Sequence, residues 1–418
     1  MRITLRHNSD RLALLTGNPR RLSLGYSADP ATVAKTLPRR ADGEHRTVLL
    51  LGGNGFVGIN LLRELLADDR VDRVYALVRP KGDNSGEARI RRQARKYKLA
   101  LPPQDKLTVL EGSYLEDDMG LPAETYRELL TTVDLVIDGA GATTHEYPYA
   151  RYREEKVLPT LRLAEFCLTE RFKTLHVIGS IGSEVYQQRR DFYRGSFFYC
   201  GYSKMKYVVK HLSLAANRAG VPIHVYQAPF ALGGPHTAFK DPGLEYSFWN
   251  MMLHLAQQKK AWPLAASIPT VAADVLARAV LNNALSDLPQ AITYPVTPVT
   301  TTDLVDRWEL EMVTWREFRR GLTRDHDVRL RDVNWRHPVS SIRRAAQRAK
   351  FVRSLFPRCL PRLLTNIHDA ATGSATLLGA GLPVIDVVDA NARNIRKLAK
   401  ALPAAVPVTE GDTVRKAA

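Results

Sequence analysis

Cysteine is scarce in this sequence and is not arranged for metal binding or disulfide formation. Three cysteines occur among 418 residues, at positions 167, 200 and 359. They do not have the spacing of a metal site, and an odd, scattered set forms no disulfide framework. This usage is typical of proteins in a reducing compartment, so we expect a cytoplasmic protein without a metal centre.

Long apolar runs are also missing, and acidic residues are outnumbered. No run reaches the length that crosses a bilayer, and the N-terminus lacks the apolar core of a signal peptide. The 43 acidic and 60 basic residues leave a formal net charge of +17, which favours acidic partners. On charge alone, nucleic acid, anionic lipid, a phosphorylated cofactor and an acidic carrier protein all fit. A hydrophobic content of 45% excludes general disorder.

The chain is organised around residues 48–58, where four apolar residues lead directly into three spaced glycines. An amphipathic stretch follows and predicts a helix over 56–67. Strand, tight turn and helix in this order suit a dinucleotide pyrophosphate, because glycine lets the backbone approach the phosphates and the helix N-terminus supplies N–H groups. The alternative is an ordinary strand–turn–helix with small residues for packing. The residues predicted to bind the cofactor here are Gly52, Gly55, Phe56, Val57 and Gly58.

The end of the second predicted strand, residues 73–79, indicates which cofactor binds. A dehydrogenase selective for NAD usually ends this strand with an acid that bonds the ribose hydroxyls. Here the strand ends in Arg79, and a guanidinium suits the 2′-phosphate of NADP through a charge-assisted contact. Arg89, in the next basic helix (88–99), is a second candidate cation. The sequence therefore predicts NADPH, with a solvated surface arginine as the alternative for Arg79.

Apolar runs alternate with helical patterns along the rest of the first half of the chain. This alternation predicts an α/β fold of the Rossmann type, in which a doubly wound parallel sheet carries helices on both faces. The further strands are predicted at 107–111, 133–138, 173–178 and 222–227, and the helices at 123–131, 150–170 and 202–219.

Three residues after the fifth predicted strand form the candidate catalytic group. Ser180 follows the strand at its carboxyl end, where open α/β sheets keep their sites. Tyr202 and Lys206 share one face of the next helix. An ammonium beside a phenol lowers the pKa of the phenol and makes it a usable acid. Lys206 can also hold the ribose hydroxyls of the cofactor, and the serine can bond the substrate oxygen.

With these motifs, residues 46–325 resemble the extended short-chain dehydrogenases, and within them the thioester reductases. That group includes the terminal reductase domains of carboxylic acid reductases and peptide synthetases, and the fatty acyl-CoA reductases. The resemblance implies that Ser180, Tyr202 and Lys206 match the catalytic Ser/Thr, Tyr and Lys. It is carried by residues 50–58 and 74–79, by Tyr147-Pro148-Tyr149, by Gly201-Tyr202 with Lys206, and by Ile268–Asp274.

The sequence departs from that family at three places. Gly112-Ser113-Tyr114 stands where relatives have Gly-Asp-Leu, so the aspartate near the adenine is missing. Lys156 stands where relatives have asparagine, and Pro159 where they have glycine. Gln227 replaces the usual arginine after the sixth strand. The chain therefore resembles a divergent member of the group.

Residues 228–300 are predicted to build the substrate side. Bulky apolar side chains there suit an acyl pocket or ordinary core packing, and both interpretations stay open. His145 follows the fourth strand, where a structural role is the more common one for a single histidine. The bulky residues are Phe230, Tyr246, Phe248, Trp249, Met251 and Met252.

A basic segment follows the region of resemblance. Residues 336–362 contain eight Lys or Arg and no Asp or Glu, together with an apolar stripe at helical spacing. Such a helix suits docking of an acidic carrier protein or contact with a membrane surface, and the alternative is a solvated helix that covers the domain.

We divide the chain into an N-terminal extension (1–44), an NADP-binding Rossmann domain (45–235), a substrate-binding region interleaved with the last Rossmann elements (236–330) and a basic helical extension (331–418). The predicted function is NADPH-dependent reduction of an acyl thioester, carried by CoA or by an acyl or peptidyl carrier protein, to an aldehyde or alcohol. The metabolism expected is that of natural products or lipids, and nucleic acid is not expected as a partner. The alternatives are a dehydrogenase of a free ketone or alcohol, an epimerase, and a non-catalytic NADPH-binding protein.

Overall fold

The computed structural model describes the chain from residue 1 to 317 with gaps, and every structural statement below concerns these residues only. Three groups of sequence predictions lie outside them: His145, the bulky residues 246–252 and the basic segment 336–362. The described residues are 1–41, 46–80, 82, 84–103, 105–141, 147–183, 201–232, 260–262, 268–286, 291–293, 295, 297–299, 305–306, 308–314 and 317.

A seven-stranded parallel sheet forms the centre of the fold, in the order β14-β10-β9-β6-β3-β4-β5. Within this sheet the chain first forms β3, next to the central strand β6, and continues outward through β4 to β5. It then returns to form β6 and continues in the opposite direction through β9 and β10 to β14. The point where the direction reverses, between β3 and β6, is where open α/β sheets bind their ligands. The strands are β3 (Arg46–Leu51), β4 (Val71–Val78), β5 (Leu107–Glu111), β6 (Leu135–Asp138), β9 (Thr174–Ile178), β10 (Ile223–Tyr226) and β14 (Ile292–Thr293).

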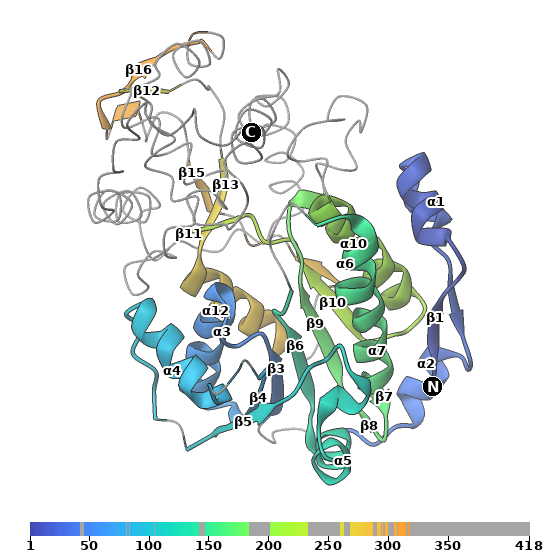
Figure 1. The fold of residues 1–418 in the computed structure, drawn as a ribbon. Coiled ribbons are helices and arrows are strands. Elements are labelled where there is room, and N and C mark those ends of the chain that lie inside the picture. The colour runs from blue at the N-terminus through green and yellow to red at the C-terminus, as the bar shows by residue number, and fades with distance from the viewer. Residues whose placement is uncertain are drawn as a thin grey trace, which may run out of the picture.

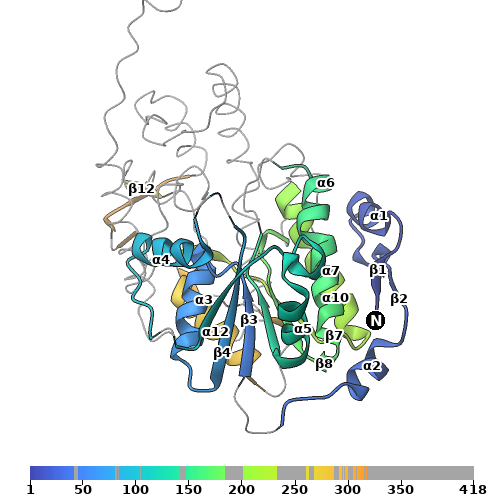
Figure 2. The ribbon, with the colours of Figure 1, turned by 60° about the horizontal axis from the view of Figure 1, so that its bottom comes forward.

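Helices cover both faces of this sheet, as Figure 2 shows along its edge. One face carries α3 (Phe56–Ala67), α4 (Gly86–Lys96) and α12 (Ala273–Ala284). The other carries α5 (Ala123–Thr132), α6 (Tyr149–Tyr152), η3 (Arg153–Val157), α7 (Leu158–Cys167) and α10 (Gly201–Arg218). Side chains of β3 alternate between the two cores: Val48 and Leu50 pack with α3, and Leu49 and Leu51 face the opposite layer. The predicted doubly wound Rossmann-type fold is confirmed.

The predicted helix at 150–170 is interrupted. Its middle is the π-helical turn η3, and residues 168–172 form a small antiparallel pair, β7 (Leu168–Thr169) with β8 (Arg171–Phe172). The buried Lys173 ammonium joins the end of α7 to this pair. Lys173 Nζ donates to the carbonyl oxygens of Phe166, Thr169 and Arg171, at 3.3, 2.8 and 2.9 Å.

The N-terminal segment, residues 1–41, is folded and packs beside α7 and α10. Figure 1 shows it in blue along one side of the sheet layer. Contacts with α7 and the β7–β8 pair hold it: the Ile3 N–H donates to Glu165, and the Arg39 guanidinium lies 3.7 Å from the Phe172 ring centroid. The segment consists of β1 (Ile3–Leu5), α1 (Ser9–Thr16), η1 (Pro19–Arg21), β2 (Leu24–Tyr26) and α2 (Pro30–Thr36).

The described part beyond residue 228 also forms two small sheets that are separate from the seven-stranded one. β13 (Ile268–Ala272) pairs with β11 (Phe230–Leu232) and β15 (Thr297–Val299), and β12 (Ala261–Trp262) pairs with β16 (Glu311–Met312). A short 3-10 turn, η2 (Asp117–Gly120), follows β5. Among the described residues, no helix is both long enough and apolar enough to cross a membrane.

Candidate functional site

The glycine loop closes tightly against the end of the neighbouring strand. Gly52 has φ +77°, a conformation that disfavours any side chain, and a Cβ on it would lie 2.8 Å from the backbone of Ala140 after β6. The Gly55 N–H donates to the Gly52 carbonyl at 2.8 Å, and a Cβ on Gly58 would overlap that same carbonyl. The glycines are therefore required by the turn itself and by the approach of α3 to it.

Phe56 and Val57, also predicted to bind the cofactor, have side chains that pack in the core around α3. They are the first two residues of α3, behind Gly55 at its N-cap. The Phe56 ring is buried and lies 5.2 Å from the ring centroid of Tyr97 in an edge arrangement. Phe56 thus anchors the first turn of α3 in the core, directly behind the glycine loop.

A cleft of about 160 Å³ opens above the glycine loop. It joins the carboxyl ends of β3, β4 and β6 at the reversal point of the sheet. The residues that line it are Leu51, Gly52, Asn54, Gly55, Leu77, Arg79, Arg89, Gly112, Tyr114, Leu115, Gly139, Ala140, Gly141 and Glu155. Four residues predicted from sequence, Gly52, Gly55, Arg79 and Arg89, are therefore brought together in one cleft.

Arg79 and Arg89 place two positive charges in the wall of this cleft. The Arg89 guanidinium donates a hydrogen bond to the main-chain carbonyl of Arg79. Burial lowers the pKa of Arg89, and the neighbouring charges of Arg79 and Arg92 add to this effect. Two like charges held together favour a bound anion. The cleft therefore combines the glycine loop with two cationic side chains in its lining.

The three residues predicted to be catalytic also lie together. Ser180 and Tyr202 both border Gly182: a Cβ on that glycine would lie 3.4 Å from Ser180 Oγ and 3.6 Å from a carbon of the Tyr202 ring. Lys206 Nζ lies 5.6 Å from the centroid of the Tyr202 ring. Gln227 Oε1 accepts from the Ser180 N–H at 3.2 Å, so this departure from the family supports the serine turn.

The Lys206 ammonium reaches the end of β9. It donates to the main-chain carbonyl of Ile178 at 2.9 Å, two residues before Ser180. The pKa of Lys206 is lowered from its ordinary 10.5 to about 7, chiefly by burial and also by the charge of Lys156, while the charge of Asp138 opposes the change. A lysine that titrates near neutral pH is poised to exchange a proton.

A close backbone approach sets the position of Tyr202. A Cβ on Gly201 would overlap the Tyr147 carbonyl and lie 2.8 Å from Pro148, so α10 begins directly against the turn before α6. The Tyr152 ring then packs edge-on against Tyr202, with centroids 6.2 Å apart. The Tyr147-Pro148 and Gly201-Tyr202 segments, far apart in the sequence, therefore lie against each other in the fold.

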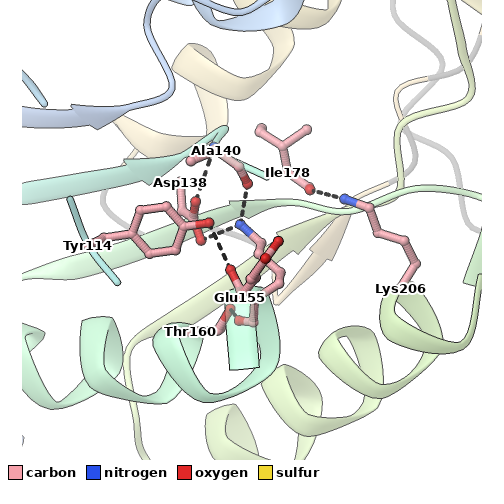
Figure 3. Close-up of polar contacts among 8 residues, drawn as sticks. Tyr114, Asp138, Ala140, Glu155, Thr160, Ile178 and Lys206 are labelled. Carbon is pink, nitrogen blue, oxygen red and sulfur yellow. Dashed lines mark hydrogen bonds and ion pairs between the residues drawn. The ribbon is translucent and has the colours of Figure 1, made fainter. Parts of the chain in front are cut away.

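The structure adds a charged group that the sequence did not predict. Asp138 ends β6, and its Oδ2 lies 2.7 Å from Nζ of Lys156, the residue that stands in place of asparagine. The same Nζ donates to the Ala140 carbonyl at 2.6 Å (Figure 3). An acid that directly ends a buried strand, Leu135-Val136-Ile137-Asp138, was the signal available in the sequence.

The departures at Tyr114 and Pro159 are coupled. Pro159 has no N–H to donate to the carbonyl of Glu155, four residues earlier in the helical path. The Tyr114 hydroxyl donates to that carbonyl instead, at 3.0 Å (Figure 3). Burial raises the pKa of Tyr114, so the phenol remains a donor. Tyr114 therefore stabilises the π-helical turn that carries Lys156.

The sheet, the glycine loop and the group around Tyr202 define a dinucleotide-binding protein of the extended short-chain dehydrogenase class, of the thioester-reductase-like kind. Within that class, residues 50–280 match the family model described as "Male sterility protein", and the chain belongs to this family, whose model is that of an NAD-binding domain.

Relatives of the chain include reductases and peptide synthetases. It is 36% identical over 172 residues to a carboxylic acid reductase of Mycobacterium marinum, covering 38% of this chain and 14% of the relative. It is 24% identical over 334 residues to a linear gramicidin synthase of Brevibacillus parabrevis, covering 75% of this chain and 6% of the relative. The chain thus spans a small part of the length of these relatives.

Solved structures share the fold. The terminal R domain of the myxalamid PKS-NRPS biosynthetic pathway has a TM-score of 0.65 at 17% identity, covering 93% of this chain and 98% of that domain. A thiolation-reductase di-domain from an archaeal non-ribosomal peptide synthetase has a TM-score of 0.57 at 15% identity, covering 94% of this chain and 79% of the di-domain.

Proposed function

We propose that this protein is an NADPH-dependent reductase that converts an acyl thioester to an aldehyde or alcohol. The observation that carries the proposal is the grouping of Ser180, Tyr202 and Lys206 at the carboxyl edge of a sheet whose neighbouring cleft holds the glycine loop and two arginines. The relatives named as carboxylic acid reductase and as R domains of peptide synthetases support the same class of reaction.

The cofactor proposed is NADPH, which supplies a hydride when bound. The main-chain N–H groups at the start of α3 would hold its pyrophosphate, and Arg79 and Arg89 its 2′-phosphate. Lys206 would hold the ribose hydroxyls. These roles agree with the positions of the residues around the cleft and beside it.

The chain's own part in the reaction is to bind and protonate the carbonyl oxygen of the thioester. Ser180 and Tyr202 lie on either side of Gly182, and in the proposed reaction both hydroxyls would donate to that oxygen and stabilise the negative charge that develops on it. Tyr202 would then transfer its proton to the oxygen, and Lys206 would lower the cost of the resulting phenolate. The thiohemiacetal would collapse with release of the thiol.

Product analysis tests this proposal directly. The purified protein is incubated with NADPH and a panel of acyl-CoA thioesters and acyl pantetheines, and aldehyde, alcohol, free thiol and NADPH oxidation are measured. We expect thiol release in step with NADPH oxidation. Turnover of free ketones without thiol release would establish the dehydrogenase alternative instead, and tight NADPH binding without any turnover would establish the non-catalytic one.

The proposal extends to domains, partner and place of action. Residues 45–235 would bind the cofactor and 236–330 the substrate; α12 and β14 from the second region complete the doubly wound layer. An acidic acyl or peptidyl carrier protein would deliver the substrate to the basic segment 336–362, as the relative that contains a thiolation domain suggests. Scarce, scattered cysteines favour action in the cytoplasm.

A further inference from the structure

Lys156 and Asp138 form a buried ion pair that adjoins the cofactor cleft. Their side chains are 2% and 0% exposed, and Nζ lies 2.7 Å from Oδ2. The same ammonium donates to the carbonyl of Ala140, a residue that lines the cleft and touches Gly52 of the glycine loop. One lysine therefore joins the helical turn η3 to the cleft wall at the end of β6.

The pair also adjoins Lys206. β6 and β9 are neighbouring parallel strands in which Asp138 lies opposite Val177, and Lys206 donates to the carbonyl of the next residue, Ile178. Two lysines thus end at adjacent strand termini, one paired with a carboxylate and the other beside Tyr202. Figure 3 shows Asp138, Ala140, Ile178 and Lys206 within one site.

Other titratable groups on the elements packed against α10 have different contacts. Tyr149 of α6 bonds Asp10 of α1, and His224 of β10 stacks on His176. The charges that act on Lys206 among the described residues are those of Lys156, which repels the ammonium, and Asp138, which attracts it. The remaining titratable groups on these elements are Arg11 of α1, Tyr26 of β2, Arg151 and Tyr152 of α6, Arg153, Glu154 and Glu155 of η3, and Tyr226 of β10. Besides Lys206, α10 itself carries Tyr202, Lys204, Tyr207, Lys210, His211 and Arg218.

A buried ion pair is weak support for stability, because two charges lose their hydration and an apolar pair of similar volume often serves as well. The Lys156–Asp138 pair lies beside Lys206, so we infer that its role is electrostatic. We propose that Lys156 and Asp138 are a positioning pair. The Lys156 ammonium holds the turn after β6 in place, and the Asp138 carboxylate balances its charge, so that Lys206 has no net charge beside it.

This inference rests on the proposed role of Lys206 as the cation beside Tyr202, and it makes a prediction that a purely structural pair does not. Asp138→Asn keeps a hydrogen-bond acceptor but leaves the Lys156 charge unbalanced, which disfavours the charged form of Lys206. Lys156→Met leaves the Asp138 charge unbalanced, which favours that form. The two single substitutions therefore act on Lys206 with opposite signs, and the double substitution restores balance.

The test is an NMR titration of lysine side chains in the cofactor-free protein. Full-length protein labelled with ¹³C-lysine is titrated in native, Asp138→Asn, Lys156→Met and doubly substituted forms, and the Lys206 Cε signal is assigned from its loss in Lys206→Arg. We expect the Lys206 midpoint to fall in Asp138→Asn and to rise in Lys156→Met, each by on the order of one pH unit, and to return close to the native value in the double variant. Shifts of the same sign, or none, overturn the proposal.

Lys173 provides an internal control. It is a second buried lysine whose ammonium is held by three carbonyls and whose pKa is lowered by burial to about 8. Its midpoint should not move in these variants. If Lys156→Met fails to fold, as judged by circular dichroism, Asp138→Asn decides alone: a lower Lys206 midpoint supports the proposal, and an unchanged or higher one overturns it. Because neither substrate nor cofactor is present, failure of the proposed thioester reduction would leave this result intact.

Discussion

The hydroxyl of Tyr149 donates a 2.6 Å hydrogen bond to the carboxylate of Asp10, a residue 139 positions earlier in the chain. The same carboxylate oxygen accepts from Arg153 Nε at 2.9 Å, and Asp10 is fully buried. Burial and the Asp10 carboxylate raise the pKa of Tyr149, so the phenol stays protonated and donates. The N-terminal segment is thereby fastened to α6 and to the first residue of η3, the turn that carries Lys156.

Removing this carboxylate should loosen that region. Asp10→Ala leaves the Tyr149 hydroxyl and the Arg153 guanidinium without their acceptor, which should lower the free energy of unfolding by about 2–3 kcal/mol. Urea denaturation followed by circular dichroism measures this loss. Asp29→Ala is the matched control in the same segment, since Asp29 caps α2 at an exposed position, and it should cost less. Equal losses in the two variants would contradict the fastening role of Asp10.

Arg79 should determine preference between the two nicotinamide cofactors. Arg79→Ala removes a charge-assisted contact to the 2′-phosphate and should weaken NADPH binding by about 1.5–3 kcal/mol while leaving NADH binding nearly unchanged. Dissociation constants for both cofactors are measured by quenching of protein fluorescence.

The control for Arg79 is Arg91→Ala. Arg91 is an exposed residue of α4 that pairs with Glu87 at the surface, away from the cleft-lining set. This variant should bind both cofactors as the native protein does. Equal dissociation constants for NADPH and NADH in the native protein would show that the two arginines do not recognise a 2′-phosphate.

Tyr202→Phe should abolish most turnover and leave NADPH binding nearly intact, because only the transferable proton is lost. Lys206→Ala should damage both turnover and binding, because in the proposed role Lys206 would also hold the ribose hydroxyls. Turnover number and cofactor dissociation constant are measured separately with a thioester that the product screen identifies. Tyr207→Phe, which removes a hydroxyl from the buried side of the same helix, is the control and should retain activity. Near-native turnover in Tyr202→Phe would exclude this tyrosine as the acid.

Cofactor binding should be accompanied by proton uptake. The pKa of Lys206 is about 7 in the cofactor-free protein, so at pH 8 its side chain is mostly neutral. The anionic phosphates of NADPH favour the charged form and raise this pKa, so binding at pH 8 should take up about one proton. Calorimetry in two buffers of different ionisation enthalpy measures the number, and uptake should vanish at pH 5.5, where Lys206 is already charged. Proton release at pH 8 would show the opposite linkage.

The sequence predicted the fold wherever a segment's own pattern decides its structure. The apolar run into Gly52, Gly55 and Gly58 fixed both β3 and α3, because a buried strand and a glycine turn leave little choice of conformation. The spacing of Tyr202 and Lys206 predicted that the two side chains share one face of a helix. The position of Ser180 could be predicted because parallel strands end at one edge of the sheet, where such proteins keep their sites.

The sequence did not predict what depends on distant contacts. The elements of residues 1–41 are short and weakly periodic, and they are stabilised by partners such as Glu165, which lies 162 positions away from Ile3. Lys156 stood out only as a departure from relatives. A lysine in a helical pattern is usually solvated, and only the approach of η3 to β6 places it against Asp138 in a dry environment.

The basic segment 336–362 should act on carrier-bound substrates and not on small ones. This prediction rests on the sequence alone: residues 336–362 contain no acid, and an apolar stripe accompanies the basic residues. Reversing Arg343, Arg344 and Arg348 to Glu should raise the Michaelis constant for a substrate tethered to an acidic carrier protein, because complementary charge mostly speeds encounter. The rate on an acyl-CoA or acyl pantetheine should hardly change, and the difference should shrink as added salt shortens the Debye length to about 8 Å near 0.15 M.

The matched control for this prediction reverses Arg6, Arg20 and Arg21, three exposed residues of the N-terminal segment, and produces the same change of net charge. If docking depends on residues 336–362, the control should retain most of its efficiency with the carrier, since general attraction between a basic protein and an acidic one is altered equally in both variants. Equal losses of efficiency with the carrier in the two variants would show that the effect depends on net charge alone. If the variant of residues 336–362 loses efficiency on small and carrier-bound substrates alike, the segment supports the fold. If it loses efficiency on neither, and the native protein co-sediments with anionic vesicles, the segment binds a membrane surface.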